Sequence, residues 1–230
     1  MAQTTLRNAK IRFQRMPVVT SVPLPMLAWP VSPSIAIAAM DVTKSGSNDS
    51  NVSKVANRID RPIVLVGMMG VGKSSVGKRL AAQLEFSFID ADDEIEQSAQ
   101  LSIPEIFENY GEDYFRDGER RVIARLIEEG SRQKIIATGG GAFCDEQTRA
   151  LILKKAIAVW LDSDIDTLVE RTGRKDNRPL LKQGNPREIL TRLRNERFGA
   201  YSQAPIQVTS AEGPHSHTVT KIIEGIDKWL

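Results

Sequence analysis

IVLVGMMGVGKSS, residues 63–75, joins a short apolar run to a glycine-rich loop that ends in a lysine and two serines. The apolar run predicts a buried strand, and Val76, Leu80 and Leu84 lie four apart on one face of a predicted helix behind the loop. From Gly67 onward the pattern is glycine, four residues, glycine, lysine and serine, which is that of a phosphate-binding loop. Because strand, loop and helix follow in the order that the motif requires, we predict that the chain binds a nucleoside triphosphate.

The residue types of this loop suit the chemistry of phosphate binding. Its glycines let backbone N–H groups approach phosphate oxygens, and the following helix adds unpaired N–H groups and the positive end of its dipole. We expect Lys73 to reach the β- and γ-phosphates and the hydroxyl of Ser74 to bind Mg²⁺. The predicted ATP contacts in the loop are Gly70, Val71, Gly72, Lys73, Ser74 and Ser75.

Short apolar runs and amphipathic stretches alternate through the rest of the chain. Further strands are predicted at residues 86–89, 135–137, 156–161 and 205–208, each with helical sequence behind it. Short strands that are apolar throughout and alternate with helices are typical of a parallel sheet covered on both faces. The sequence therefore predicts an α/β fold, with one domain over residues 61–230.

One of the predicted helices has clear end signals. Ser102-Ile-Pro-Glu105 is a capping-box sequence, which predicts the first turn of a helix. Gly111 is a natural C-terminal end for that helix, and Val122 and Ile123 mark a further one.

The first sixty residues differ from the rest. Residues 1–40 contain no Asp or Glu, and residues 16–40 carry no charge but hold five prolines, which would break a membrane-spanning helix. We interpret residues 1–60 as a disordered or low-complexity extension, or as upstream sequence with Met40 as the real start, and residues 41–60 as a flexible polar linker. A secretory signal and an organelle transit peptide are the alternatives for residues 1–40.

Overall charge and cysteine content exclude several classes of protein. The 31 Lys and Arg nearly balance the 29 Asp and Glu, so the chain is no disordered polyelectrolyte and offers no global case for nucleic-acid binding. The single cysteine, Cys144, forms neither an intrachain disulfide nor a cysteine-based zinc site. We expect a cytoplasmic protein that binds neither nucleic acid nor membrane.

The phosphate loop alone does not choose among GTPases, motor ATPases and small-molecule kinases. Behind it the sequence has neither an Asp-x-x-Gly switch nor an Asn-Lys-x-Asp guanine motif, which argues against a GTPase. A domain of residues 61–230 is also short for a motor ATPase. The choice of phosphoryl acceptor therefore depends on the residues behind the second strand.

Carboxylates follow the second predicted strand, where ligands bind in open α/β sheets. Asp90 and Asp92 lie two apart, so on an extended segment they would point the same way, one toward a metal and one toward an acceptor hydroxyl. The alternative is a solvated first turn of a helix, because Asp92, Asp93 and Glu94 suit the positive end of the helix dipole. The residues alone leave both open.

Arginines and a glycine triplet complete the candidate ligand contacts. Arg116 is either a surface ion pair or a bidentate clamp for a carboxylate. Residues 139–141 are all glycine, which allows close approach of a ligand or simply a tight turn. Nine basic residues between 171 and 197, including Arg178, form a solvated face, a nucleic-acid patch or a mobile lid over the phosphates. No aromatic residue lies among them, so base stacking is not indicated.

At this point the sequence resembles the shikimate kinases, small phosphate-loop kinases of aromatic amino-acid biosynthesis. The landmarks match in the family's order and approximate spacing: Gly-Met-Met-Gly-Val-Gly-Lys-Ser, Asp-Ala-Asp, Phe-Arg116, Gly-Gly-Gly-Ala, Asn-Arg178-Pro-Leu-Leu and Glu-Arg197. The resemblance implies a three-layer αβα fold of the nucleoside-monophosphate-kinase type with a five-stranded parallel sheet. It also implies a substrate-binding insert at about residues 93–130 and a lid at about residues 172–183.

The activity that the resemblance implies is transfer of the γ-phosphoryl group of ATP to the 3-hydroxyl of shikimate, by a monomeric, Mg²⁺-dependent enzyme. On the phosphate side, Lys73 would stabilise the transferring group and Ser74 would ligate the metal. Asp90 would belong to the surroundings of the metal, through water, and Arg178 would be the lid arginine on ATP.

On the acceptor side, the resemblance implies that Asp92 holds the acceptor hydroxyl and takes its proton. Arg116 and Arg197 would clamp the carboxylate of shikimate, and the backbone of Gly140 would contact the substrate. Where the family usually has Arg-x-Pro-x-Tyr, this chain has Gly199 in place of the proline, which we expect to loosen that turn. No equivalent of the family's adenine contact is evident near the C-terminus.

Two other functions remain as hypotheses. A kinase for another small hydroxy acid, such as gluconate, would share the phosphate loop, but the paired arginines and Asp-x-Asp favour shikimate. A catalytically silent nucleotide-binding module is a third hypothesis. It is disfavoured because Lys73, Asp92 and Arg178 are all retained.

Overall fold

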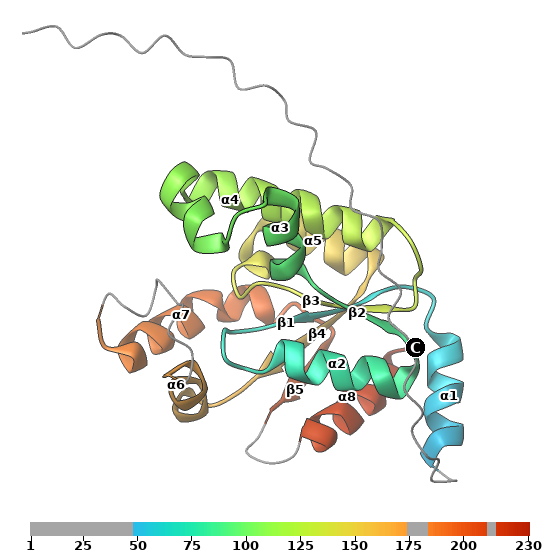
Figure 1. Cartoon of the computed structure of the whole chain (residues 1–230). Coiled ribbons are helices and arrows are strands. Elements are labelled where there is room, and N and C mark those ends of the chain that lie inside the picture. Colours follow the sequence, from blue (N-terminus) through green and yellow to red (C-terminus); the bar gives the residue numbers. More distant parts are fainter. Residues whose placement is uncertain (1–47, 174–183, 211–214) are drawn as a thin grey trace, which may run out of the picture. The chain divides into compact units, whose positions relative to one another are not determined.

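The computed structural model describes residues 48–173, 184–210 and 215–230 (Figure 1). The predicted extension over residues 1–47 lies outside the described residues, as do most of the predicted lid and Arg178 within it. Within the described ranges, no helix has the length and apolar character needed to cross a membrane.

Five parallel strands form one sheet in the order β2-β3-β1-β4-β5, which confirms the predicted α/β fold. The strands are β1 (Ile63–Val66), β2 (Ser87–Asp90), β3 (Lys134–Ala137), β4 (Ile157–Asp162) and β5 (Ile206–Thr209). In the centre of the sheet, Val64 pairs with Ile136 of β3 and with Ala158 of β4. All four residues of β1 are buried, because helices cover both faces, and this explains the absence of alternation in its sequence.

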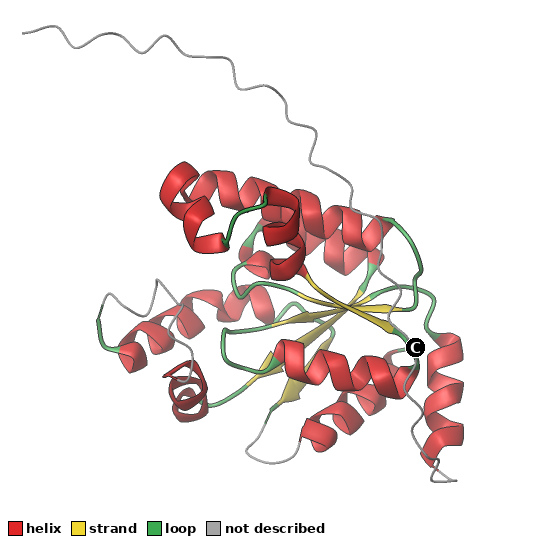
Figure 2. Cartoon of the chain, viewed as in Figure 1, coloured by secondary structure: helices red, strands yellow, loops and turns green. Residues whose placement is uncertain are grey.

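Helices cover the sheet on both sides and give three layers (Figure 2). One side carries α3 (Ala91–Ala99), α4 (Ile103–Glu128) and α5 (Glu146–Lys155), and the other carries α2 (Lys73–Leu84) and α8 (His215–Trp229). The remaining elements are α1 (Asn48–Arg58), α6 (Ile165–Gly173), α7 (Pro186–Tyr201) and a short 3₁₀ helix, η1 (Ala142–Cys144).

Helix α1 lies where the sequence was expected to be a flexible linker, so that prediction is wrong from residue 48 onward. Val52, Val55 and Ile59 are buried, because α1 packs against α2 and α8. Arg58 also forms an ion pair with Asp227 of α8. These contacts make α1 part of the folded domain.

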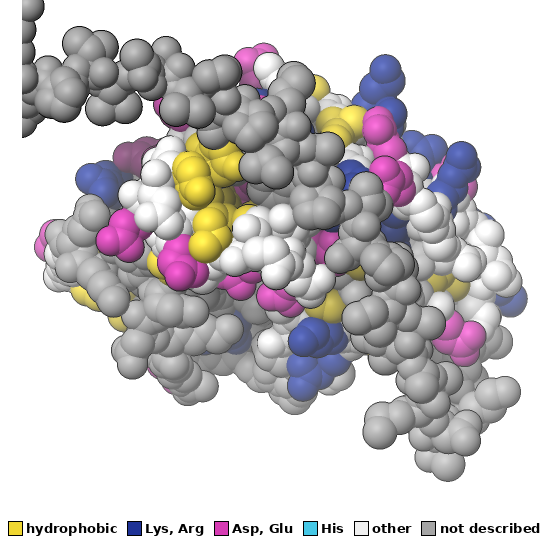
Figure 3. Space-filling view, turned by 45° about the horizontal axis from the view of Figure 1, so that its top comes forward, with side chains coloured by type: hydrophobic (Ala, Val, Ile, Leu, Met, Phe, Trp, Pro, Cys, Tyr) yellow, Lys and Arg dark blue, Asp and Glu magenta, His cyan; other side chains and the backbone are white. Residues whose placement is uncertain are grey.

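Helix α4 begins as predicted and ends later than predicted. The side chain of Ser102 accepts a hydrogen bond from the N–H of Glu105, and the Glu105 carboxylate accepts one from the N–H of Ser102, which is the expected capping box. Gly111 does not end the helix: its backbone is non-helical (φ 83°, ψ 176°) and makes a kink, after which α4 continues to Glu128. The outer face of α4 carries the exposed, stacked rings of Tyr110 and Tyr114, and Figure 3 shows apolar and acidic side chains together on this side.

The topology brings three loops to one edge of the sheet. Strand β1 lies between β3 and β4: β2 and β3 are added on one side of β1, and β4 and β5 are then added on the other side. Ligands in open parallel sheets bind at the carboxyl ends of the strands beside such a switch point. At that edge lie the phosphate loop behind β1, Asp90 at the end of β2 and the glycine triplet behind β3.

Candidate active site

Glycine backbone conformations shape the phosphate loop. Gly67, Gly70 and Gly72 all have positive φ angles, and Gly72 is the N-cap of α2. A Cβ atom on Gly67 would lie 2.2 Å from the backbone oxygen of Leu161, so no other residue fits there. The ammonium group of Lys73 donates to the carbonyl oxygen of Gly67 at 2.8 Å, which holds the lysine over the loop.

Ser74 and Asp90 form an oxygen-rich pair at the start of α2. The Ser74 hydroxyl donates to Oδ2 of Asp90 at 2.6 Å, and Oδ1 of Asp90 accepts from the N–H of Asp92 at 3.2 Å. Asp90 is thus also the N-cap of α3. A hydroxyl and a carboxylate beside a phosphate-binding loop are the hard oxygen donors that Mg²⁺ prefers, so these residues fit the metal predicted from the sequence.

Asp92 lies in the first turn of α3, so the extended arrangement with Asp90 is wrong. The helix alternative is right about the backbone, but Asp92 is partly buried rather than solvated. The pKa of Asp92 is raised to about 6, chiefly by burial and then by the negative charges of Asp90 and Glu119, against the opposing charge of Lys73. The Asp92 carboxyl group faces the glycine triplet, since a Cβ atom on Gly139 would lie 3.0 Å from its Oδ1.

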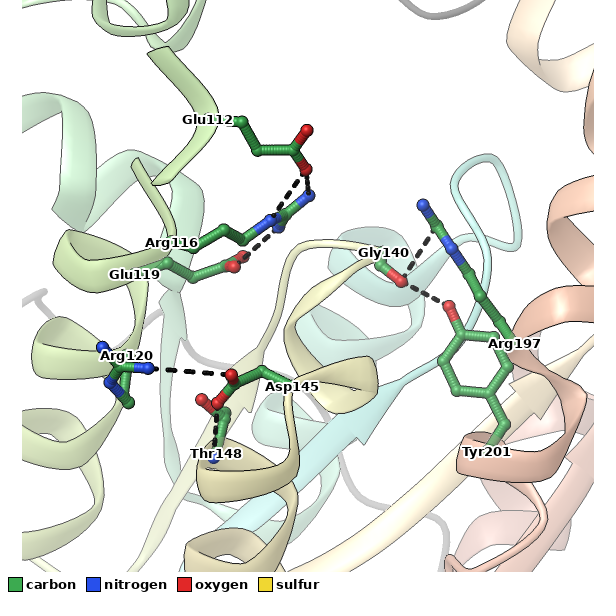
Figure 4. Close-up of polar contacts among 9 residues, drawn as sticks. All are labelled: Glu112, Arg116, Glu119, Arg120, Gly140, Asp145, Thr148, Arg197 and Tyr201. Carbon is green, nitrogen blue, oxygen red and sulfur yellow. Dashed lines mark hydrogen bonds and ion pairs between the residues drawn. The ribbon is translucent and has the colours of Figure 1, made fainter. Parts of the chain in front are cut away.

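Arg116, on α4, is held by two carboxylates of its own helix (Figure 4). Its Nη1 donates to Oε2 of Glu119 at 2.7 Å, and its Nη2 donates to Oε1 of Glu112 at 3.1 Å. Glu119 is buried, which raises its pKa, and its Oε1 has no hydrogen-bond partner among the residues that the structure describes. Neither Glu112 nor Glu119 was predicted from the sequence. Their positions four residues before and three after Arg116 on a helix were the available signal.

Arg197 reaches the glycine triplet from the opposite side, on α7. Its Nη1 donates to the carbonyl oxygen of Gly140 at 3.1 Å, and the hydroxyl of Tyr201 donates to the same oxygen. Figure 4 shows Gly140 between Arg116 on one side and Arg197 on the other. A Cβ atom on Gly141 would lie within 2.9 Å of three atoms of the Arg116 guanidinium group, so this guanidinium group lies directly against the glycine triplet.

The structure therefore brings Asp92, Arg116, Gly140 and Arg197 together at the edge that carries the phosphate loop. Two guanidinium groups, which are suited to binding a small anion, thus lie beside a carboxyl group with a raised pKa and the phosphate loop.

Comparison with known proteins agrees with this arrangement. The family model for shikimate kinase matches residues 69–227. The shikimate kinase of Novosphingobium aromaticivorans is 63% identical over 185 residues, which cover 80% of this chain and 96% of the relative. The chain belongs to the shikimate kinase family. Members of this family are ATP-dependent kinases that phosphorylate a hydroxyl group of shikimate.

Solved structures give the same family and fold. A shikimate kinase from Acinetobacter baumannii, solved in complex with shikimate, is 35% identical with a TM-score of 0.72, covering 76% of this chain and 97% of that chain. A gluconokinase from Sinorhizobium meliloti is 19% identical with a TM-score of 0.51, covering 75% and 94%. The gluconokinase match shows a shared fold and gives no support to gluconate as the acceptor.

Two residues that the sequence singled out, Arg178 and Gly199, are not among the residues that the structure brings together at this site. Arg178 lies outside the described residues, so its predicted role on ATP stays a prediction. Gly199 lies inside α7 rather than in a turn, and a Cβ atom there would meet nothing within 4 Å. The glycine therefore costs the helix some intrinsic stability.

Proposed function

We propose that the chain transfers the γ-phosphoryl group of ATP to the 3-hydroxyl of shikimate, using Lys73, Asp92, Arg116 and Arg197. The observation that carries this assignment is the pair of guanidinium groups, from α4 and α7, on either side of Gly140. Shikimate carries one carboxylate and several hydroxyls, so it offers one anion for the arginine pair and one hydroxyl for the carboxyl group beside it.

The arginine pair would bind the shikimate carboxylate. A planar guanidinium group matches a carboxylate with two parallel hydrogen bonds, and such bonds are stronger than neutral ones. Arg116 is already held by Glu112 and Glu119, and Arg197 by Gly140, so little side-chain freedom is lost on binding. This orientation would turn the far side of the ring toward the phosphate loop.

Asp92 would accept the proton of the acceptor hydroxyl. With a pKa raised to about 6 by burial and by neighbouring carboxylates, Asp92 is a stronger base than an ordinary aspartate yet is still ionised at neutral pH. Its carboxyl group lies beside Gly139, which supports a role for Asp92 in the acceptor site.

Lys73, Ser74 and Asp90 would serve the phosphates. Lys73 lies over the carbonyl oxygens of Gly67 and Met68, from which a γ-phosphate would attract its ammonium group. Ser74 would ligate Mg²⁺ and Asp90 would hold one of its waters. The ion, when bound, neutralises charge on the phosphates. The protein contributes mainly alignment and fixed positive charge.

We also propose a monomer as the active form, because the residues assigned to the acceptor, Asp92, Arg116 and Arg197, all reach the glycine triplet within one copy of the chain. A cytoplasmic location is proposed with it, because the reaction consumes ATP.

Release of ADP by the full chain, measured in a coupled assay with Mg-ATP and shikimate, gluconate or no acceptor, tests the proposal. We expect release that depends on shikimate alone. Release of ADP at the same rate without acceptor, or with gluconate in place of shikimate, would contradict it. Lys73→Ala serves as the control for contaminating kinases, since it removes the phosphate-binding ammonium group.

A further inference from the structure

The carbonyl oxygen of Gly140 accepts two hydrogen bonds from one helix. Arg197 and Tyr201 lie four residues apart on α7 and therefore share a face, and both donate to this oxygen. A carbonyl oxygen has two lone pairs, so the two donors together saturate it. The function described above uses Arg197 and gives no role to Tyr201.

These bonds fix the orientation of a whole peptide group. The peptide is planar and trans, so the N–H of Gly141 points away from the side to which the carbonyl of Gly140 points. The carbonyl faces α7. The N–H of Gly141 therefore points toward α3 and α4, where a Cβ atom on Gly141 would touch the guanidinium group of Arg116.

Glycine makes this restraint necessary. A loop of three glycines has more accessible backbone conformations than any other triplet, so the peptide could turn over unless something holds it. Neither Gly140 nor Gly141 forms a hydrogen bond through its N–H to another described residue, whereas the N–H of Ala142 donates to the carbonyl of Gly139. Among the described residues, the bonds from α7 are thus the restraint on the Gly140–Gly141 peptide.

Tyr201 is itself held rigidly. It is 1% exposed, and its ring stacks on Trp160 with centroids 5.8 Å apart. Trp160 belongs to β4, which lies between β1 and β5, and its ring also packs edge to face against Phe198 of α7. Burial raises the pKa of the Tyr201 phenol, so the hydroxyl keeps its proton and donates at every pH at which the enzyme works.

We propose that Tyr201 is a positioning residue, which holds the Gly140–Gly141 peptide so that its N–H faces the acceptor's carboxylate and its C=O restrains Arg197. Tyr201 acts through these groups and touches neither substrate. The hydroxyl also lies 4.0 Å from the sulfur of Met68 in the phosphate loop, but its single proton goes to the closer carbonyl oxygen of Gly140, so we expect its effect to fall mainly on acceptor binding. The inference rests on the proposed function, and its test uses an enzyme already shown to phosphorylate shikimate.

Tyr201→Phe removes the hydroxyl and keeps the ring against Trp160. We expect the KM for shikimate to rise roughly three- to tenfold, as for loss of one hydrogen bond of ordinary strength, with a smaller change in kcat. The KM for ATP and the Kd for ATP should not change. Tyr110→Phe, the same substitution at an exposed ring of α4, is the matched control and should leave all four quantities unchanged.

A double-mutant cycle separates positioning from a merely structural role. Tyr201→Phe and Arg197→Lys act on the same carbonyl oxygen, so their effects on the KM for shikimate should be less than additive. The proposal is wrong if the two effects add, or if Tyr201→Phe leaves the KM for shikimate unchanged. It is equally wrong if the kinetic parameters for ATP and shikimate worsen together.

If Tyr201→Phe does not fold, Trp160→Phe, which loosens the tyrosine ring, should show the same selective rise in the KM for shikimate on a smaller scale. Complete absence of shikimate-dependent turnover in the unmodified chain would instead refute the proposed function.

Discussion

The phosphate loop and the proposed acceptor site share one edge of the sheet but are built in opposite ways. The loop is one continuous segment, whose shape follows from glycines with positive φ and from the start of α2. The acceptor site collects Asp92, Arg116, Gly140 and Arg197 from four separate elements, and ion pairs and backbone hydrogen bonds hold it together. Nucleotide binding is therefore a local property of the chain, whereas acceptor choice is a property of the folded domain. Substitutions should be able to damage one without the other.

Among the substitutions, Asp92→Asn should reduce catalysis the most while leaving ATP binding intact. Asparagine keeps the size of the side chain but cannot take the proton of the acceptor hydroxyl, so kcat should fall by at least about 100-fold. The Kd for ATP, measured by calorimetry, should stay within about twofold, because the loop keeps its hydrogen bonds. Asp93→Asn, at the exposed neighbouring position, is the control. Parallel loss of ATP binding in Asp92→Asn would show that the two regions are not separable.

Arg116→Lys should affect the acceptor side selectively. Lysine keeps the charge but loses the planar fork, so we expect the KM for shikimate to rise about tenfold or more while the KM for ATP is unchanged. Arg121→Lys on the same helix, where the arginine forms a surface ion pair with Asp117, should behave like the unmodified enzyme. Steady-state kinetics with each substrate varied in turn would decide, and equal behaviour of the two variants would contradict the clamp.

Lowering the pH should reduce activity with shikimate, because it protonates Asp92. The raised pKa of about 6 belongs to a group that must be ionised to accept a proton, so kcat/KM for shikimate should fall as the pH drops below about 6. Glu119→Gln removes a negative charge that raises this pKa, so the acid limb of the pH profile should move to lower pH. A limb that stays in place or moves to higher pH would show that another group titrates.

The smallest effect should come from Gly199→Ala. Gly199 is exposed inside α7 with open space around its Cβ direction, so alanine should stabilise the fold by about 0.5–1 kcal/mol through helix propensity. Thermal unfolding should show a rise in Tm of a few degrees, with kinetics for both substrates unchanged. A fall in Tm, or a change in the KM for shikimate, would mean that the flexibility of α7 near Arg197 is used.

The same contrast explains what could be predicted of the site. The strand, turn and helix of the phosphate loop were predicted because their conformation depends on residues adjacent in the sequence, while the ATP and Mg²⁺ contacts of the loop stay predictions. Asp92 and Arg116 were recognised as candidates, but their partners were not. The bond of Tyr201 to Gly140 joins residues 61 apart, and only the folded chain brings them together.

The fold shows a similar division. Strands β1, β3 and β4 were predicted because the inner strands of a parallel sheet are buried and largely apolar, whereas the edge strands β2 and β5 are less buried and more polar. Helix α1 was missed because its sequence is mostly polar, although Val52, Val55, Ala56 and Ile59 have the spacing of one helical face. A helix end was predicted at Gly111, but the structure has a kink there. The helix continues because the apolar residues that follow Gly111 are buried against the rest of the domain. Long-range packing decided both cases.

The most direct test of a separable acceptor site uses the unmodified chain and an altered substrate. A shikimate analogue in which a hydroxymethyl group replaces the carboxylate keeps the reacting hydroxyl and removes the group that Arg116 and Arg197 bind. We predict that kcat/KM for this analogue is lower than that for shikimate by at least about 100-fold, with the KM for ATP unchanged. Phosphorylation of the analogue as efficiently as shikimate would contradict the account.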